Sequence, residues 1–456
     1  MITLVKPLKH ITSLWSNQSL DYSAAFRLMK YTIRVEDSGR TLLHNAVTRQ
    51  LVVLDPEEAE ILEKLPVSRS SVMEQLISAH FLVPINFDEH KLVQNIRCIL
   101  RKLDTAKNQN IITNYTIFPT TACNARCYYC FEQGAKTITM TEQTADKVVD
   151  FITHHCGKNN RVHITWFGGE PTVAANRIDQ ISDGLKKNGV EFYSDMNTNG
   201  YLFDEKLVQK ALSLWNLKYL QICFDGLEEN HNSIKNYTNV RDNPYERTLR
   251  NIGLLLDAGI GVGLRMNFDV SNYQDFEGLV NEAAKRFTGY KGLSVYAFPI
   301  NGKYADKDGI VRHGDDDWFT AKLAELNEIS RNSGLYRERQ ILPFLKYHCC
   351  YAENNNAIDV TPDGNLVRCC ECFGDEETVG TIWDGITDID LYNSWNIYAE
   401  YDKCRDCVYY PSCVRIKRCP GEDRCLFYSE WNLRNERTIK ETLRHAVDKS
   451  VIKEDC

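Results

Sequence analysis

The sequence predicts an α/β protein whose centre is a partial (β/α)6 barrel. Three observations predict this fold class. From residue 113 to about 335, short β-branched runs alternate with amphipathic helical stretches, which is typical of parallel βαβ units. A smaller pattern of strands and helices precedes this region, and a cysteine-rich region follows it. We therefore expect a small N-terminal domain at 1–103, the barrel at 113–335 and a C-terminal domain at 345–430.

Length and composition agree with two or three globular domains. The chain has 456 residues, of which 43% are hydrophobic and 11% aromatic, so it can bury substantial cores. The net charge of −8 argues against a nucleic-acid-binding protein. No apolar run approaches the roughly 18 residues of a transmembrane helix, and residues 1–15 lack the apolar core of a signal peptide. We expect a cytoplasmic protein with neither membrane nor nucleic acid as a partner.

Cysteine usage points to metal chemistry. Of 17 cysteines, ten fall within residues 349–425. Secreted disulfide scaffolds are usually short, whereas this chain is long and its cysteine count is odd. Metal or cluster binding in a reducing compartment therefore fits better than a disulfide framework.

The N-terminal region predicts a winged-helix-like domain. Its predicted strands are 31–37, 41–47 and 50–55, and its predicted helices are 57–65, 69–79 and 87–103. Asp55 and Pro56 suit the N-cap and the first position of the first of these helices, whereas residues 1–30 carry no strong pattern. The helices contain few Lys and Arg residues, which favours a peptide over DNA as the ligand. A peptide would bind by adding a strand to the sheet edge; a purely structural extension also fits.

The barrel region carries six strand–helix units after a predicted polar linker at 104–112. The predicted strands are 114–119, 161–167, 191–197, 219–225, 262–268 and 293–299, and the predicted helices are 142–155, 174–188, 204–214, 245–258 and 272–286. Active-site groups of such barrels lie at the C-terminal ends of the strands. The residues that follow each predicted strand are therefore the first candidates for chemistry.

Cys123, Cys127 and Cys130 follow the first predicted strand with C-x3-C-x2-C spacing. Cysteine thiolates hold iron–sulfur clusters, usually four to a cluster, so three thiolates leave one iron open to a small molecule. A zinc knuckle or a group of buried thiols is the alternative. Zinc sites usually add a second C-x2-C or a His pair, and only unpaired His and Cys residues follow up to residue 160.

With Phe131 after the third cysteine, this spacing resembles the radical S-adenosylmethionine (SAM) superfamily. The resemblance implies that the three cysteines hold a [4Fe–4S] cluster and that SAM chelates the fourth iron. It also implies that an electron from the cluster cleaves SAM to a 5′-deoxyadenosyl radical, which abstracts a hydrogen atom from the substrate.

The resemblance extends to other strand ends. Gly168-Gly169-Glu170-Pro171 matches the family's GGEP motif, whose carboxylate contacts the SAM amino group; such a carboxylate suits an ammonium, and glycines permit a close approach of the backbone. Arginine suits a carboxylate. The residues that would contact SAM are Phe131, Gly168, Gly169, Glu170, Pro171, Asn197, Asp225 and Arg265. Cys223 stands where relatives usually have Ser, and its role stays open between a small buried residue and a neighbour of SAM.

The C-terminal cysteines resemble the SPASM domain, which binds two auxiliary [4Fe–4S] clusters. A predicted hairpin turns at Pro362-Asp363-Gly364. After it, two residues separate Cys404 from Cys407, and five residues separate each of the next cysteines, Cys413, Cys419 and Cys425, from the one before. The resemblance implies Cys404, Cys407, Cys413 and Cys425 as ligands of one cluster, and Cys369, Cys419 and either Cys349 or Cys350 as ligands of the other. The fourth ligand of this second cluster would be the other residue of the Cys349–Cys350 pair, or Cys370, or Cys372, or no protein residue. A zinc-ribbon pair is the alternative, and the tail at 431–456 is predicted to be helical.

Together the three parts resemble maturases of ribosomally made peptides. The implied reaction is hydrogen abstraction from a precursor peptide that is bound through its leader, with a flavodoxin- or ferredoxin-type electron donor. The most frequent product in such relatives is a thioether between a cysteine sulfur and carbon, as in sactipeptide and ranthipeptide enzymes; carbon–carbon crosslinking and epimerisation also occur. A sulfatase-maturing enzyme is the rival, although it has Asp where Cys370 follows Cys369. The non-enzyme alternative is a metal-binding winged-helix regulator.

Overall fold

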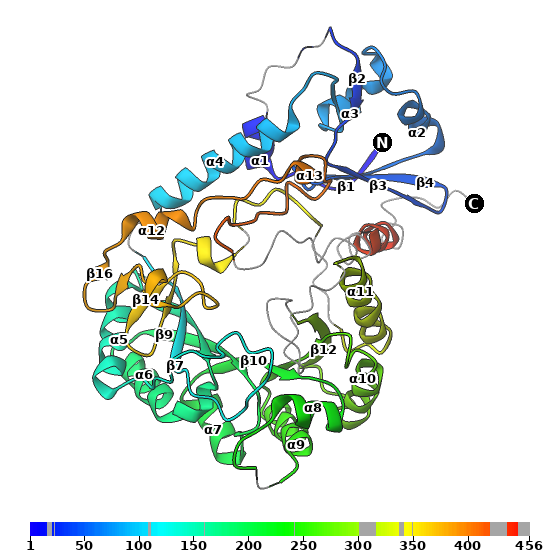
Figure 1. Cartoon of the computed structure of the whole chain (residues 1–456). Helices are drawn as coiled ribbons and strands as arrows, with labels where there is room; N and C mark the ends of the chain where they lie inside the picture. The colour runs from blue at the N-terminus through cyan, green and yellow to red at the C-terminus, as the bar shows by residue number, and fades with distance from the viewer. Residues whose placement is uncertain are drawn as a thin grey trace.

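The computed structural model describes residues 1–15, 21, 23–107, 111–158, 160–240, 242–300, 316–336, 342–348, 350–419 and 436–445. Its largest element is a sheet in the order β12-β11-β10-β9-β8-β7-β13-β14-β15-β16. Figure 1 shows this sheet curving around the lower half of the molecule, with the N-terminal domain above it and the cysteine-rich C-terminal region between the two. The predicted α/β class is confirmed.

Six parallel strands form the predicted partial barrel. They are β7 (Asn114–Thr120), β8 (Arg161–Gly168), β9 (Glu191–Thr198), β10 (Leu217–Phe224), β11 (Gly261–Phe268) and β12 (Leu293–Pro299). The helices are α5 (Glu142–His155), α6 (Ala175–Lys187), α7 (Glu205–Ser213), α8 (Glu228–Lys235), α9 (Pro244–Asp257), α10 (Asp275–Arg286) and α11 (Asp316–Asn332). All six predicted strands and the five helices predicted between them are present. The sequence pattern of residues 315–332 also predicts a helix, and it is present as α11, whereas α8 is an additional helix that the sequence pattern did not predict.

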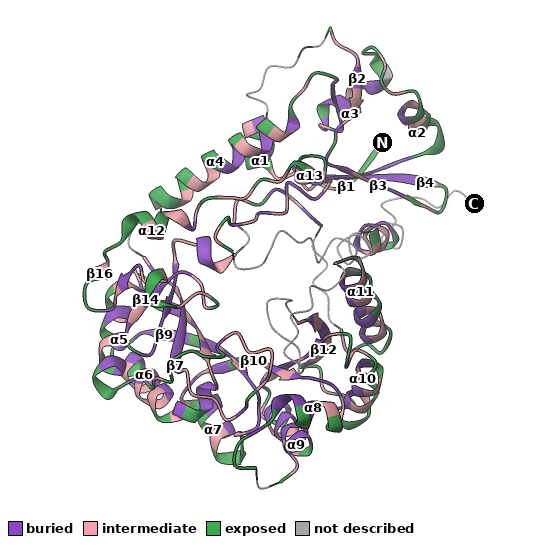
Figure 2. Ribbon diagram, viewed as in Figure 1, coloured by how far each residue is buried: buried purple, intermediate pink, exposed green. Residues whose placement is uncertain are grey.

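The alternation of side chains along each strand decides which residues point to the core under the outer helices and which point into the barrel. On β10, Leu220, Ile222 and Phe224 are fully buried and join the core shared with the outer helices, because alternate residues of a strand point to the same face. Gln221 and Cys223 therefore point to the opposite, inner face of the barrel. Figure 2 shows the same division in the helices, whose inner faces are buried and whose outer faces are exposed.

The C-terminal hairpin extends the barrel sheet. Its strands are β13 (Ala357–Val360) and β14 (Asn365–Val367), followed by β15 (Gly380–Thr381), β16 (Gly385–Ile386), α12 (Ile389–Ser394) and α13 (Asp402–Arg405). The predicted hairpin is present. Its first strand, β13, pairs in parallel with β7, with Asp359 opposite Thr116. The cysteine-rich region is thus attached to the barrel beside the first barrel strand, which precedes the cysteine triplet.

The N-terminal domain has more elements than the sequence pattern predicted. Its sheet has the order β1-β5-β4-β3, and β2 pairs with β6. The strands are β1 (Ile2–Val5), β2 (Phe26–Leu28), β3 (Thr32–Asp37), β4 (Arg40–Asn45), β5 (Leu51–Leu54) and β6 (Leu82–Pro84), and the helices are α1 (Lys9–Trp15), α2 (Pro56–Glu63), α3 (Glu74–Ser78) and α4 (Glu89–Lys107). Residues 1–30, which lack a strong sequence pattern, therefore contribute two strands and a helix. The linker predicted from residue 104 begins instead as the last turn of α4.

The N-terminal domain packs firmly against the cysteine-rich region. Arg97 of α4 is 7% exposed, and its Nη2 donates to the carbonyls of Tyr410 at 2.6 Å and Cys413 at 2.9 Å. His44 of β4 bonds the carbonyl of Pro343 at 2.6 Å. A helix at 436–445 covers one face of the sheet with two buried side chains in the same apolar cluster as β4 and β5. Across the described ranges, no helix has the length and apolarity needed to span a membrane.

Candidate active site

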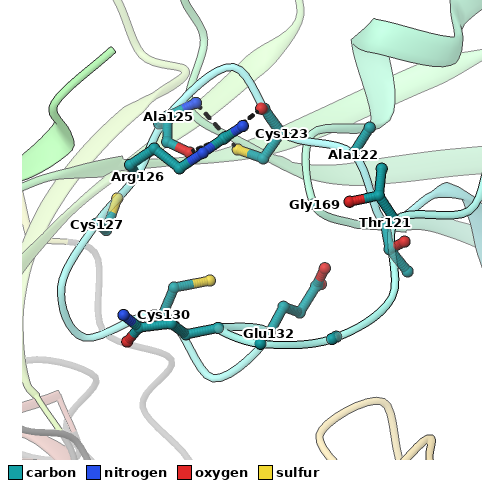
Figure 3. Close-up of a pocket in the computed structure, with 13 residues that line it drawn as sticks. Thr121, Ala122, Cys123, Ala125, Arg126, Cys127, Cys130, Glu132 and Gly169 are labelled. Carbon is teal, nitrogen blue, oxygen red and sulfur yellow. Dashed lines mark hydrogen bonds between the residues drawn. The ribbon is translucent and has the colours of Figure 1, made fainter. Parts of the chain in front are cut away.

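The three cysteines of the triplet surround one cavity of about 270 Å³. Cys123, Cys127 and Cys130 lie on the loop that leaves β7, and Gly169 closes the cavity from the end of β8. Figure 3 shows the three thiols spaced around the cavity instead of converging on one point. In agreement with that spacing, no three His, Cys, Asp or Glu side chains of the described residues are arranged to hold a metal ion. A group of several atoms, such as a cluster, suits thiols that are placed around a cavity.

Burial makes these thiols weakly acidic in the protein alone. It raises the pKa of Cys123 to about 11 and that of Cys127 to about 12, and it raises the pKa of Cys130 as well. The buried ammonium of Lys235 lowers the pKa of all three thiols and so partly opposes burial. A coordinated metal deprotonates a thiol outright, so binding of iron would overcome the cost that burial places on the thiolates.

Two glycines bring the end of β8 close to the cysteine loop. Gly168 has φ +112°, and a Cβ on it would lie 2.3 Å from the carbonyl oxygen of Thr120. A Cβ on Gly169 would lie 2.5 Å from the carbonyl oxygens of Thr121 and Ala122. Any larger residue would collide with main chain, which cannot move aside easily. The glycines of the GGEP segment therefore let β8 pack against the start of the loop that carries the thiols.

Glu170 joins three parts of the site. Its carboxylate is fully buried and accepts from the Thr172 backbone N–H at 3.1 Å, the Thr198 hydroxyl at 2.8 Å and the Asn199 backbone N–H at 2.8 Å. Asn199 in turn donates to the side chain of Asn124, in the cysteine loop, at 2.7 Å. Burial raises the pKa of Glu170, and these hydrogen bonds oppose the rise. The contacts fix the ends of β8 and β9 against the cysteine loop.

A buried ion pair supports the loop from the other side. Lys235 Nζ, at the end of α8, lies 2.9 Å from Asp225 Oδ2, and the two side chains are 3% and 0% exposed. The Tyr129 hydroxyl donates to Asp225 at 2.6 Å and lies 3.1 Å from Lys235 Nζ. Burial works against the Lys235 ammonium, but Asp225 and its other neighbours outweigh it, so the pKa of Lys235 is raised well above its usual value. Tyr129 stands between the second and third cysteines, so this network holds the loop on β10 and α8.

Residues 117–283 match the family model described as the Radical SAM superfamily. The central domain belongs to the radical SAM superfamily. No curated protein is significantly similar to the chain in sequence.

Two solved proteins share the fold over most of the chain. The structure of anSMEcpe with bound AdoMet and the Cp18Cys peptide is 18% identical, has a TM-score of 0.51, and covers 75% of this chain and 98% of that chain. Streptococcus suis SuiB bound to the precursor peptide SuiA is 15% identical, has a TM-score of 0.50, and covers 85% of this chain and 94% of that chain. At these identities the likeness concerns the fold.

A radical SAM domain implies one [4Fe–4S] cluster and SAM. The donor set around the cavity fits this cluster, because three thiols and no fourth ligand side chain of the usual kind line it. When bound, the cluster supplies the electron for SAM cleavage. The chain's own contribution is to hold the thiols in place through the Glu170 and Lys235 networks.

The other predicted SAM contacts lie at or near the strand ends. Arg265 of β11 is half-buried; its Nε donates to Asn267 Oδ1 at 2.9 Å, and its guanidinium lies 4.7 Å from the Phe298 ring centre. Cys223 lies opposite Arg265 in the sheet register, and Asn197 lies one strand further along, opposite Gln221. These residues share the inner face of the radical SAM domain, which keeps the predicted contacts together.

Phe131 belongs to an aromatic group that joins the two cysteine regions. Its ring centre lies 6.1 Å from those of Phe167 on β8 and Phe373. Phe118 of β7 contacts the same two rings, at 5.3 and 5.5 Å. Phe373 follows Cys372 directly, so this group ties the cluster loop of the radical SAM domain to the C-terminal cysteines.

The C-terminal cysteines form two groups in the described residues. Cys350, Cys369 and Cys372 pack against one small apolar cluster that contains Trp395. Burial raises the pKa of Cys350, and the nearby Cys419 raises it further. The other group is Cys404, Cys407 and Cys413, in one short segment with Cys407 N–H bonded to the Cys404 carbonyl at 3.2 Å. Cys349 and Cys425, also predicted as ligands, lie outside the described residues.

Sequence reasoning missed several residues that the fold brings to the site. Glu132, Tyr129, Asn199 and Lys235 were not predicted, although Tyr129 and Glu132 lie within or beside the cysteine triplet and Asn199 lies two residues after Asn197. Adjacency to the cysteine triplet could have indicated Glu132 and Tyr129. Lys235 carries no local signal, because it reaches Tyr129 from 106 positions away.

Proposed function

We propose that the protein is a radical SAM maturase that abstracts a hydrogen atom from a ribosomally made precursor peptide. Installation of a thioether between a cysteine sulfur and carbon is the product we favour, with carbon–carbon crosslinking or epimerisation as alternatives in the same class. The observation that carries the proposal is the placement of the cysteine cavity. It lies at the C-terminal ends of parallel strands, where barrel enzymes hold their chemistry, and a cysteine-rich region is attached beside it on β13.

We infer that the domain at 1–103 binds the precursor's leader. In the described residues, β3 is an edge strand of the N-terminal sheet with no strand beyond it, whereas the opposite edge is formed by β1. A peptide strand could therefore pair along β3 through main-chain hydrogen bonds. The acidic helix α2, PEEAEILE, does not suit a DNA backbone. Helix α4 of the same domain also contacts the cysteine-rich region, through the bonds of Arg97 to the carbonyls of Tyr410 and Cys413, which would keep a bound leader near the rest of its peptide.

We also infer two auxiliary [4Fe–4S] clusters in a domain at 345–430. The proposed ligands are the predicted ones: Cys404, Cys407, Cys413 and Cys425 for one cluster, and Cys369, Cys419 and Cys349 or Cys350 for the other. The grouping of Cys350 and Cys369 about one apolar cluster supports the second set. Cys372 packs there too, which makes it a candidate for the fourth ligand.

A sulfatase-maturing activity is the second candidate, and the fold likeness to anSMEcpe favours it. Two observations support the precursor-peptide proposal instead. Cys370 occupies the position after Cys369 where sulfatase-maturing enzymes have Asp. SuiB, whose structure holds the precursor peptide SuiA, covers 85% of this chain against 75% for anSMEcpe.

The experiment combines SAM cleavage with analysis of the substrate. Protein reconstituted anaerobically with iron and sulfide should contain about twelve irons per chain, because three clusters of four irons each are proposed. It should form 5′-deoxyadenosine when it is reduced by dithionite or by a flavodoxin- or ferredoxin-type donor. Cys123→Ala should abolish this product, whereas Cys98→Ala, at an exposed cysteine of α4, should leave it unchanged. A finding of about four irons would remove the auxiliary clusters from the proposal.

The product decides between the candidates. Mass spectrometry of a co-expressed precursor should show the loss of two hydrogens for each crosslink. Conversion of a sulfatase cysteine or serine to formylglycine, with no change in any precursor peptide, would instead establish the second candidate.

A further inference from the structure

A second cavity, of about 570 Å³, lies at the N-terminal ends of the barrel strands, whereas the cysteine loop follows a C-terminal end. Its wall includes a row of residues on three neighbouring parallel strands. In this row Asn114 of β7 lies opposite His163 of β8, which lies opposite Tyr193 of β9. Arg161, at the start of β8, and Lys158, in the turn after α5, line the same cavity. None of these residues takes part in the proposed chemistry of the cysteine cavity.

Two ring side chains give this second cavity a flat, ordered surface. The rings of His163 and Tyr193 are stacked, with their centres 4.7 Å apart and their planes 27° from parallel. His163 Nε2 lies 2.8 Å from Asp195 Oδ2, and this contact fixes the orientation of the imidazole. Tyr193 is nevertheless 40% exposed, so part of its ring is open to a ligand. An exposed and ordered aromatic ring is a surface on which another flat ring can stack.

Two cations border the ring surface without a counter-ion. The Arg161 guanidinium lies 5.7 Å from the centre of the Tyr193 ring. Glu191 stands opposite Arg161 in the sheet register, but within the part of the chain that the structure describes, no carboxylate forms an ion pair with Arg161 or Lys158. A guanidinium presents several N–H donors that match a carboxylate or a phosphate. The cavity therefore combines a stacking surface with donors for an anion, although the chain as a whole has a net charge of −8.

We propose that this second cavity binds a small organic anion that carries a flat ring, with the ring on Tyr193 and the anionic group on Arg161 and Lys158. Nucleotides and aromatic carboxylates share this chemistry. The volume of the cavity lies within the roughly 300–1,000 Å³ of small-molecule sites. Asn114 Nδ2 donates to Thr113 Oγ1 at 3.0 Å, which leaves the Asn114 side-chain oxygen to accept from a polar edge of the ring. The inference does not depend on the proposed reaction at the cysteine cavity.

The test titrates four probes into the full-length protein, reconstituted anaerobically with iron and sulfide, and follows binding by isothermal titration calorimetry. Uridine monophosphate represents the nucleotides and phenylacetate the aromatic carboxylates, whereas uridine and inorganic phosphate each carry only half of the proposed chemistry. Saturating S-adenosylhomocysteine is present throughout, so that no probe reports on the SAM site. The variants are Arg161→Gln and Tyr193→Leu. The matched control is Arg250→Gln, at an exposed position of α9.

We expect uridine monophosphate, phenylacetate or both to bind with a Kd of about 1 mM or lower, and about tenfold more tightly than uridine or phosphate. Arg161→Gln should weaken this binding about tenfold, the lower end of the range for one hydrogen bond to a charged group. Tyr193→Leu should weaken it roughly fivefold, because the ring loses its stacking partner. Arg250→Gln should match wild type.

The pattern of binding also identifies the source of the ligand. Binding of uridine monophosphate alone would indicate a nucleotide, binding of phenylacetate alone would indicate an aromatic carboxylate, and binding of both would support the chemistry that they share. Absence of binding by both probes up to about 10 mM, tenfold above the expected Kd, would overturn the inference. An equally tight complex with uridine or phosphate, or an equal loss of affinity in Arg161→Gln and Arg250→Gln, would also overturn it.

Discussion

Replacing Lys235 by methionine tests whether the buried ion pair holds the cluster loop. The substitution keeps a long apolar stem and removes the ammonium, so Asp225 stays fully buried without its counter-ion. Breaking a buried pair in this way destabilises a protein by about 3–5 kcal/mol. The Tyr129 hydroxyl still donates to Asp225 at 2.6 Å, which places the expected loss toward the lower end of that range.

The loss should appear as a lower melting temperature of the reconstituted protein. For a domain of 150–250 residues, about 1 kcal/mol corresponds to roughly 2–4 °C, so Lys235→Met should melt about 6–12 °C below wild type when followed by circular dichroism under anaerobic conditions. The double variant Lys235→Met/Asp225→Asn removes both charges and should recover part of the loss, because no uncompensated charge remains. A melting temperature of Lys235→Met within 2 °C of wild type, or a double variant that is less stable than the single one, would contradict this reasoning.

Three further predictions concern other parts of the fold. Burial lowers the pKa of His44 to about 4, below the value of about 6.5 for an unfolded chain. Because the unfolded state binds the extra proton first, the free energy of unfolding falls as pH drops from about 6.5 to about 4. In acid-denaturation curves, His44→Gln should therefore lose about 3 kcal/mol less stability over that interval than wild type. Gly168→Ala should reduce both iron content and melting temperature, because its Cβ meets backbone at 2.3 Å, whereas Gly189→Ala, with positive φ but nothing within 4 Å, should lower only the melting temperature, by a few degrees. Arg97→Ala should increase hydrogen exchange in the cysteine-rich region, and Lys102→Ala, at an exposed position of the same helix, should not.

The sequence alone predicted most of the barrel, because regular alternation of strands and helices is a local signal. The first barrel strand, predicted at 114–119, is observed as Asn114–Thr120, and the predicted helix at 142–155 has the same bounds in α5. Predictions failed where the local signal is weak. Residues 1–30 carry no clear period, yet β1 forms there because Ile2–Val5 can pair with β5.

At the cysteine cavity, too, some residues could be predicted from local sequence signals and others could not. C-x3-C-x2-C spacing identified the three thiols, since ligands of one cluster can lie close together in the chain. The positions of Glu132 and Lys235 at the cavity could not be predicted from spacing in the same way. Glu132 stands out because its buried carboxylate has no hydrogen-bond partner among the described residues. Lys235 stands out because its two partners, Asp225 and Tyr129, lie in different parts of the chain.

By itself, then, the sequence determined the α/β class, the position of the cluster loop after the first barrel strand and the presence of a second cysteine region. Tertiary structure decided that β13 lies beside β7, that Arg97 binds the N-terminal domain to the cysteine-rich region, and that one carboxylate remains open to the cluster cavity. The physical reason is the range of the interactions involved. Periodicity, caps and ligand spacing act within a few residues of the chain, whereas strand pairing, burial and charge pairing depend on residues that only folding brings together.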